Sequence, residues 1–305
     1  NITIDDALAQ APQLKQYYNS DDNVRRIIDI ARGLEGMPRN ASTHAAGIII
    51  TSSEASDYVP LALGKEGEGV VTQFHMKTIE EIGLVKMDIL GLRNLTIIDD
   101  AVKQIRKTSP DFDINAIPDD DDKAYAMLAE GKTLGVFQLE SGGMTNVVTS
   151  LVPHSIEEIM AVVALYRPGP MESIPRFING KQHPEQVRYR HPMLKDILDT
   201  TYGCIVYQEQ VMEIFKQLAG YSLGKADLVR RAISKKKFDV LQAERDSFIK
   251  GCDKNGVPAH TANALFDEIL DFANYAFPKG HAAAYAVVSY QTAYLKANYP
   301  REYMG

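Results

Sequence analysis

The spacing of hydrophobic and polar residues changes along the chain and divides it into two regions. Residues 1–36 place apolar side chains among charges at helical spacing and predict helix. Three short apolar runs then predict β-strands, with a helical segment at Thr78–Ile82 before the last of them. The predicted strands are Ala46–Thr51, Val70–Phe74 and Leu84–Leu90. We expect these strands to form one small sheet.

From residue 95 onward the spacing is mainly helical. The predicted helices are Leu95–Arg106, Lys123–Ala129, Ser155–Tyr166, Gln208–Ala219, Gly224–Lys236, Phe238–Cys252, Thr261–Phe272 and Ala282–Asn298. Ser155 and Glu158 have the spacing of a capping box, and the Arg-Pro-Gly-Pro turn at residues 167–170 ends the helix that they begin. The expected fold class is α+β, with a small, mainly antiparallel sheet followed by a large helical region from about residue 94.

Composition excludes several classes of protein. A length of 305 residues corresponds to about two domains, and 45% hydrophobic with 24% charged residues is typical of a globular chain. No apolar run approaches the roughly 18 residues of a membrane span, so we expect no membrane segment. The chain begins at Asn1, and a helical pattern runs almost to Gly305. We therefore interpret it as a fragment of a longer protein.

Cysteine and histidine content argues against a zinc or disulfide framework. Cys204 and Cys252 are the only cysteines, which favours a reducing cytoplasm. The seven histidines lack the spacing of a zinc site. Gly131-Lys-Thr133 resembles the end of a phosphate-binding loop, but Ala126 stands where that motif needs its first glycine. No G-x-S-x-G motif is present to begin acyl transfer.

Charge is distributed unevenly around a net value of −7. Residues 1–150 carry 14 basic and 23 acidic side chains, a net −9, whereas residues 151–305 carry 19 and 17, a net +2. Between residues 225 and 237 six basic side chains face only Asp227. They are Lys225, Arg230, Arg231, Lys235, Lys236 and Lys237. This cluster is either a solvated helix end or a face that binds a phosphate-bearing ligand.

Two groups of acidic residues are candidates for cation binding. Asp111, Asp113 and Asp119–Asp122 lie in loop-like sequence before a predicted helix, where the favoured interpretation is capping and helix-dipole pairing. Lys86 and Asp88 stand two apart in an otherwise apolar strand and therefore point to one face. They form either a mutual ion pair or a site where the carboxylate holds a cation and the ammonium meets a phosphate.

Further cations occur at positions suited to anions. Arg167 stands on a stiff proline-rich turn, although it can also cap its own helix. Arg230, Arg231 and Lys235 form a row of donors along the predicted helix. One interhelical loop contains an aromatic ring, an ammonium and an imidazole, although such loops are often only connections. These three residues are Tyr275, Lys279 and His281.

Several longer strings together resemble one family. They are Asn40-Ala-Ser-Thr-His-Ala-Ala-Gly47, Gly83-Leu-Val-Lys-Met-Asp-Ile-Leu-Gly-Leu92, Val136-Phe-Gln-Leu-Glu-Ser141, Arg167-Pro-Gly-Pro170, Tyr207-Gln-Glu-Gln-Val211, Arg230-Arg-Ala-Ile-Ser-Lys-Lys-Lys237 and His281-Ala-Ala-Ala-Tyr285. The chain resembles, in order and over its whole length, the alpha subunits of bacterial DNA polymerase III, the C-family replicative polymerases.

The resemblance implies a domain plan and a set of site residues. Residues 1–40 correspond to the end of the thumb, 41–94 to the second palm segment and 95–305 to the fingers. Asp88 corresponds to a catalytic, metal-binding carboxylate and Lys86 to a neighbour of the nucleotide phosphates. The finger residues that surround the nucleotide and the primer-template end are Arg167, Arg230, Arg231, Lys235, Tyr275, Lys279 and His281.

The resemblance also implies the reaction and its participants. It implies template-directed nucleotidyl transfer from a deoxynucleoside triphosphate to a primer, with Mg²⁺ as the cofactor and primer-template DNA as the partner. The sliding clamp and other replisome subunits would bind regions outside this chain, and the family's other two catalytic aspartates lie upstream of Asn1. We therefore expect the chain to be inactive alone. The alternative is a nucleic-acid-binding module without catalysis, for which Asp88 would be unfavourable because it repels phosphates.

Overall fold

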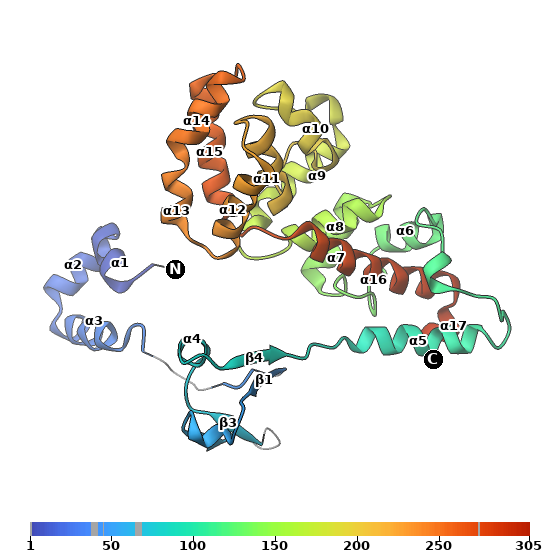
Figure 1. Ribbon diagram of the computed structural model, residues 1–305, viewed down its shortest axis with the longest axis horizontal. Coiled ribbons are helices and arrows are strands. Elements are labelled where there is room, and N and C mark those ends of the chain that lie inside the picture. The colour runs from blue at the N-terminus through green and yellow to red at the C-terminus, as the bar shows by residue number, and fades with distance from the viewer. Residues whose placement is uncertain (1, 38–41, 45, 65–68, 274) are drawn as a thin grey trace. The chain divides into compact units, whose positions relative to one another are not determined.

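The structure is a computed structural model that describes residues 2–37, 42–44, 46–64, 69–273 and 275–305 (Figure 1). The chain divides into two compact units, Asn1–Gly91 and Leu92–Gly305. The first unit contains short helices and two small antiparallel sheets, and the second is helical. The predicted α+β fold class is therefore confirmed. Within the described ranges, no helix is both long enough and apolar enough to cross a membrane.

Three short helices form the N-terminal part of the first unit, as the sequence predicts. They are α1 (Ile4–Gln10), α2 (Pro12–Ser20) and α3 (Asp22–Leu34). Side-chain caps begin two of them, because Thr3 accepts a hydrogen bond from the Asp6 amide and Asp21 accepts from the amides of Asn23 and Val24. Residues 4–34 contain no buried side chain. These helices therefore contribute little hydrophobic core to the unit.

The strands of the first unit form two sheets rather than the single sheet predicted. The strands are β1 (Gly47–Ile50), β2 (Leu61–Leu63), β3 (Val70–Thr72) and β4 (Val85–Asp88), with α4 (Met76–Glu81) before β4. Among the residues that the structure describes, β1 pairs only with β4 and β2 only with β3, both antiparallel. The sequence pattern misses β2 because its Leu-Ala-Leu run contains no β-branched residue. Residues 40, 41 and 45 of the Asn40–Gly47 motif lie outside the described residues.

The β1–β4 ladder has two chemically different faces. Gly47 stands opposite Asp88 and Ile49 opposite Lys86, so these four residues share one face. The other face carries the pairs Ile48–Met87 and Ile50–Val85, and all four of those side chains are about half exposed. The register therefore places the only charged pair of the ladder on one side of the sheet.

The second unit contains all the helical segments predicted after residue 94. Its helices are α5 (Arg93–Ile105), α6 (Asp122–Ala129), α7 (Gly142–Leu151), α8 (Ile156–Leu165), α9 (Ile174–Gln182), α10 (Lys195–Leu198), α11 (Gln208–Gln217), α12 (Leu223–Ser234), α13 (Phe238–Ala243), α14 (Arg245–Lys254), α15 (Ala259–Ala273), α16 (Lys279–Asn298) and α17 (Pro300–Met304). The single helix predicted at 238–252 is two, because the chain bends at Glu244. There the carboxylate accepts a hydrogen bond from Tyr221 and pairs with Lys225.

Four helices of this unit, α7, α9, α10 and α17, are absent from the list of predicted helices, and α7 and α9 are the longest of them. α7 begins with Gly142 and Gly143, residues that normally argue against a helix. A Cβ built on Gly143 would lie 1.8 Å from the Tyr166 hydroxyl, so a long-range contact explains this glycine. α9 contains Pro175 in its first turn, where proline is tolerated. Both helices therefore begin with residues whose local preference does not indicate a helix.

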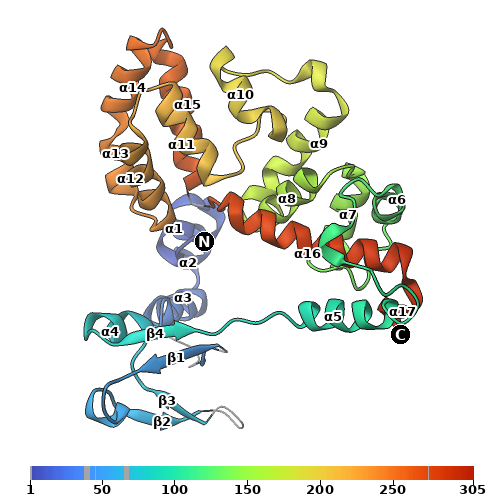
Figure 2. The ribbon, with the colours of Figure 1, turned by 45° about the vertical axis from the view of Figure 1, so that its right-hand side comes forward.

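Two main hydrophobic clusters support the second unit. The first gathers side chains of α6, α7, α8 and α9 around α16, and α16 lies beside α8 in both views (Figures 1 and 2). The second gathers α11, α12, α14 and α15, where Phe215 packs against Phe248 at 4.6 Å between ring centroids. The loop from α15 to α16 connects these two groups of helices. It contains Tyr275, Phe277 and Pro278.

A nearly buried polar cluster joins α8 to α9. Lys181 Nζ lies 2.7 Å from Glu158 Oε2, and the two side chains are only 15% and 9% exposed. The other Glu158 oxygen accepts a hydrogen bond from the Tyr202 hydroxyl, and burial raises the pKa of Tyr202. Glu158 also accepts from the His154 amide, while Ser155 accepts from the Glu158 amide. The predicted capping box is therefore formed, except that the Glu158 carboxylate accepts its hydrogen bond from the His154 amide instead of the Ser155 amide.

Candidate functional site

The side chains of Lys86 and Asp88 meet on one face of β4. Lys86 Nζ donates a short hydrogen bond to Asp88 Oδ1, and the exposed fractions are 14% for Lys86 and 40% for Asp88. The predicted ion pair is therefore present. Asp88 keeps a solvent-accessible carboxylate at the end of the strand, so the pair does not close it to other ligands.

Two residues before and at the start of β1 complete this cluster. His44 Nδ1 lies 3.8 Å from Asp88 Oδ1 and accepts a hydrogen bond from the Ala46 amide at 3.3 Å. Gly47, which faces Asp88 across the ladder, adds no side chain. We call Lys86, Asp88, His44 and Gly47 the strand-end cluster. It joins two segments that are about forty residues apart in the sequence.

Electrostatics keep the Asp88 carboxylate ionised. The hydrogen bond from Lys86 is the main cause that holds the pKa of Asp88 below its usual range, and the Lys86 charge adds to it. An ionised carboxylate is a suitable oxygen ligand for Mg²⁺, which prefers few protein carboxylates together with waters and phosphates. The described residues contain no group of three or more side chains arranged to hold a metal ion. Asp88 therefore fits as one ligand of a site that needs further oxygens.

Two of the other acidic candidates, Asp113 and Asp121, act as caps, in agreement with the favoured interpretation. Asp113 accepts a hydrogen bond from the Asn115 amide at the start of a short 3₁₀ turn. Asp121 accepts from the Ala124 amide at the start of α6. These carboxylates stabilise chain turns in the second unit, as short polar side chains do at helix starts.

Arg167 lies against the loop from α15 to α16. Its guanidinium donates to the Tyr275 carbonyl at 2.7 Å and stacks over the Phe277 ring at 4.2 Å. It also donates to the Ala164 carbonyl at 3.0 Å, so the predicted capping of its own helix is formed. Burial lowers the pKa of Arg167, although an arginine remains charged at neutral pH.

A glycine allows the aromatic ring of Tyr275 to approach the Arg167 turn. Gly169 has φ = 102°, and a Cβ built there would lie 2.3 Å from the Tyr275 ring. The structure therefore brings Arg167 and Tyr275 together from segments about 108 residues apart.

Lys279 and His281 lie in the first turn of α16, beside the same loop. The His281 ring lies 4.1 Å from the Tyr285 ring, at a tilt, and makes an edge-to-face contact with Phe277 at 5.2 Å between centroids. The Lys279 amide donates to Glu209 Oε2 at 2.8 Å, and its ammonium lies 5.9 Å from the centre of the Tyr207 ring. Arg167, Tyr275, Phe277, Lys279 and His281 form what we call the loop cluster, an arrangement of cations and aromatic rings suited to phosphates and bases.

Arg230 and Arg231 share one carboxylate in the last turns of α12. Arg230 Nε donates to one Asp227 oxygen at 2.9 Å and Arg231 Nε to the other at 2.7 Å. The hydrogen bond from Arg230 is the largest cause that lowers the pKa of Asp227. Lys235, which follows α12, is exposed. The Asp227 carboxylate therefore neutralises part of the positive charge of this row of basic side chains.

A hydrogen-bond chain connects this row to the loop cluster. The Ser234 hydroxyl donates to Gln208 Oε1 at 2.9 Å, and the buried Gln208 amide nitrogen donates to the Ala276 carbonyl at 3.5 Å. The Gln208 backbone amide also donates to the Phe277 carbonyl at 3.0 Å. All seven predicted finger residues therefore lie on neighbouring elements of the second unit.

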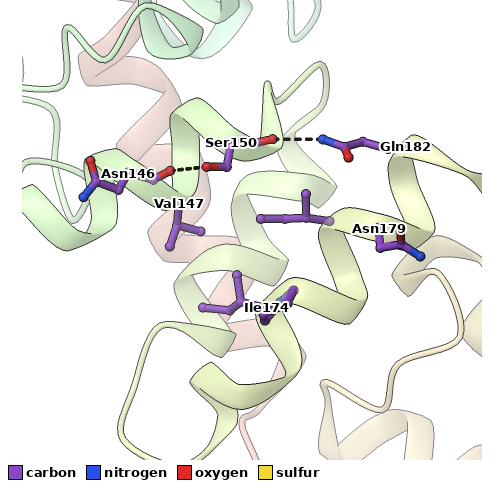
Figure 3. A pocket seen from close by; sticks show the side chains of 8 residues that line it. Asn146, Val147, Ser150, Ile174, Asn179 and Gln182 are labelled. Atoms are coloured by element: carbon purple, nitrogen blue, oxygen red, sulfur yellow. Dashed lines mark hydrogen bonds between the residues drawn. The ribbon is translucent and has the colours of Figure 1, made fainter.

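An open groove between α7 and α9 lies apart from these residues (Figure 3). Val147, Ile174 and Ile178 give it an apolar floor, and amide side chains such as Asn146 and Gln182 line its rim. None of the predicted site residues belongs to its lining. The groove therefore gives no support to the predicted metal and nucleotide sites.

Sequence reasoning did not select four residues that the structure places at these clusters. They are His44, Gly47, Glu209 and Phe277. His44, Gly47 and Glu209 lie within the motifs that carry the family resemblance. Those motifs could therefore have drawn attention to them, but nothing in the sequence shows that they contact the site. Phe277 had no such signal, because its stacking with Arg167 is a long-range contact.

Comparison with known proteins identifies the family. Residues 94–256 match the bacterial DNA polymerase III alpha subunit finger domain, and residues 1–91 match the bacterial DNA polymerase III alpha NTPase domain. The chain belongs to the bacterial DNA polymerase III alpha subunit family. The resemblance noted in the sequence is therefore confirmed, and the two matched regions meet close to the boundary between the two structural units.

Individual polymerase III alpha subunits match almost the whole chain. The DNA polymerase III subunit alpha of Bacillus subtilis strain 168 is 48% identical over 304 residues, which are 99% of this chain and 27% of that protein. The Thermus aquaticus subunit is 48% identical over 307 residues, 99% of this chain and 25% of that protein. The Escherichia coli K12 subunit is 46% identical over 315 residues, which are 99% of this chain and 27% of that protein. The chain thus spans about a quarter of the length of these relatives.

Proposed function

We propose that this chain is part of a template-directed DNA polymerase that transfers a nucleotidyl group from a deoxynucleoside triphosphate to a primer 3′ hydroxyl in chromosomal replication. The observation that carries the proposal is the Lys86–Asp88 pair on β4, in a chain that belongs to a replicative polymerase family. We assign residues 1–40 to the end of the thumb, 41–94 to the second palm segment and 95–305 to the fingers.

In this proposal Asp88 holds a divalent cation and Lys86 contacts nucleotide phosphate. Mg²⁺ bound with upstream carboxylates would favour deprotonation of the attacking hydroxyl and stabilise the leaving pyrophosphate. Lys86 keeps Asp88 ionised before substrate arrives and brings a positive charge to the same face. A fixed charge so placed offsets the negative charge that develops on phosphate oxygens.

The second unit supplies cations for the nucleotide and the primer-template end. Arg167 is the most rigid of these, because two carbonyls and the Phe277 ring fix its guanidinium. Tyr275 and His281 offer rings for stacking, and Lys279, Arg230, Arg231 and Lys235 offer charge for phosphates. No step in this proposal requires a covalent protein intermediate.

The proposed partners follow from this chemistry. They are primer-template DNA and the incoming nucleotide, with the sliding clamp and other replisome subunits binding regions outside this chain. A protein acting on bacterial chromosomal DNA would work in the cytoplasm. The alternative function, a DNA-binding module without catalysis, is disfavoured by the exposed carboxylate of Asp88, which repels phosphates in the absence of a cation.

The test of the proposal is magnesium-dependent primer extension by a full-length subunit that contains this sequence. We expect the 305-residue chain alone not to extend a primer, because Asp88 offers too few oxygens to hold two divalent cations. It should still bind primer-template DNA through the basic side chains of the second unit, with affinity that falls steeply between about 50 and 200 mM salt. Extension by the chain alone that Asp113→Asn abolishes would contradict both the domain assignment and the choice of Asp88.

Alanine substitutions in the full-length subunit test the cations of the second unit. We expect Arg167→Ala, Arg230→Ala and Arg231→Ala each to lower nucleotide kcat/KM or primer-template affinity by roughly 10- to 150-fold, since a charge-assisted bond contributes about 1.5–3 kcal/mol. Steady-state extension and DNA titration measure this. Arg188→Ala is the matched control, because the exposed Arg188 donates only to nearby carbonyls. Wild-type values for all three variants would mean that the cluster is solvated surface.

A further inference from the structure

We propose that Gly47 is a positioning residue of the strand-end cluster, and that its missing side chain provides the space in which Lys86 and Asp88 meet. This inference rests on the proposed function, because it assigns a role at the same site. Gly47 stands directly opposite Asp88 in the β1–β4 ladder, where paired side chains project to the same face. Any side chain at position 47 would therefore enter the cluster.

The space above Gly47 is already filled by the functional side chains. A Cβ built there would lie 2.9 Å from Lys86 Cε, 3.0 Å from His44 Nδ1 and 3.3 Å from Asp88 Oδ1. Three cluster side chains thus converge on the position that a single methyl group would occupy. Real Cβ atoms do not approach other heavy atoms as closely as the distance to Lys86 Cε, so at least one neighbour must move.

The same geometry shows which neighbour moves when a methyl group is added. The three nearest atoms all belong to side chains, and Gly47 has no left-handed backbone conformation that an alanine would strain. Lys86 Cε is the closest atom and lies near the end of a flexible chain. Alanine at position 47 therefore shifts Lys86 away from Asp88 while leaving the β1–β4 backbone pairing unchanged.

A shift of this kind affects chemistry more than stability. Lys86 holds Asp88 in its ionised form through their hydrogen bond, and displacement weakens that bond. Misplacing a catalytic group by about 1 Å can cost about 100-fold in rate. We therefore expect Gly47→Ala in a full-length subunit to lower nucleotide kcat/KM by about 10- to 100-fold, with thermal stability and primer-template Kd unchanged.

The matched control is Gly33→Ala in α3 of the same unit. Gly33 has no heavy atom within 4 Å of a built Cβ and no positive φ, so it accepts the same substitution without a contact. We expect its kcat/KM and DNA affinity to equal those of the wild type, and its melting temperature to be equal or slightly higher because alanine favours helix more than glycine does. An equal loss of activity in Gly33→Ala and Gly47→Ala would overturn the inference.

A double-mutant cycle separates positioning from general damage. If Gly47→Ala acts by displacing Lys86, its effect on kcat/KM should largely vanish in a Lys86→Ala background. An undiminished effect in that background would overturn the inference, as would a loss of activity that accompanies parallel losses of melting temperature and DNA affinity. The proposed function has a separate test, because it requires Asp88→Asn to be inactive whatever the result for Gly47→Ala.

Discussion

Replacement of Asp88 by asparagine in a full-length subunit is expected to reduce nucleotide incorporation by at least about 10³-fold. An amide has the shape of the carboxylate but lacks its negative charge, so it cannot balance a divalent cation. Lys86 then loses its negatively charged partner at the end of β4, although an amide oxygen could still accept its hydrogen bond. Because Asp88 is 40% exposed and contributes no core packing, folding and DNA binding should persist. Primer extension at saturating nucleotide, with DNA affinity measured in parallel, gives the result.

The control for this variant is Asp113→Asn. Asp113 caps a 3₁₀ turn by accepting a hydrogen bond from the Asn115 amide, and asparagine caps about equally well. Asp113→Asn should therefore extend primers at the wild-type rate. Activity of Asp88→Asn within tenfold of the wild type would show that Asp88 is only a structural partner of Lys86, and the proposed function would then lose its main support.

The second large effect concerns stability and the polar cluster between α8 and α9. Lys181→Met removes the cation that faces the nearly buried Glu158 carboxylate and leaves a negative charge with only hydrogen-bond partners. Removing one partner of a buried ion pair costs about 3–5 kcal/mol. We expect a loss near the lower value, because methionine keeps the aliphatic packing of the lysine stem. Chemical denaturation followed by far-ultraviolet circular dichroism measures the change.

A matched exposed lysine provides the comparison. Lys195→Met at the start of α10 changes the same chemical group where the side chain is exposed, so its effect should stay within about 0.5 kcal/mol. If both variants unfolded at the same denaturant concentration as the wild type, Glu158 would have sufficient partners in Tyr202 and the His154 amide. The cluster would then not depend on its cation.

The sequence was most informative where the chemistry is local. Amphipathic spacing predicted the main helices, because that spacing reports directly which side of a helix is buried. The i, i+2 spacing of Lys86 and Asp88 predicted that they share a face of a strand, and the structure places them in contact. The predicted capping roles of Asp113 and Asp121 were likewise correct, since a cap depends on the next few residues only.

Long-range pairing could not be predicted from spacing alone. The register that sets Gly47 against Asp88 joins segments separated by β2, β3 and α4, and no local pattern encodes it. The stacking of Arg167 on Phe277 arises in the same way. The glycines at the start of α7 disfavour a helix locally, and the long-range approach of the Tyr166 hydroxyl explains Gly143. The functional roles of the site residues remain predictions.

The carboxylate of Asp227 has a consequence for the thermodynamics of DNA binding. Each cation that meets a phosphate normally releases a condensed counterion from DNA, and the number released sets the slope of log K against log salt. Arg230 and Arg231 already share Asp227, so these three side chains together carry one net positive charge rather than two. In the proposed function, this row should therefore release fewer ions on binding DNA than its number of arginines and lysines suggests.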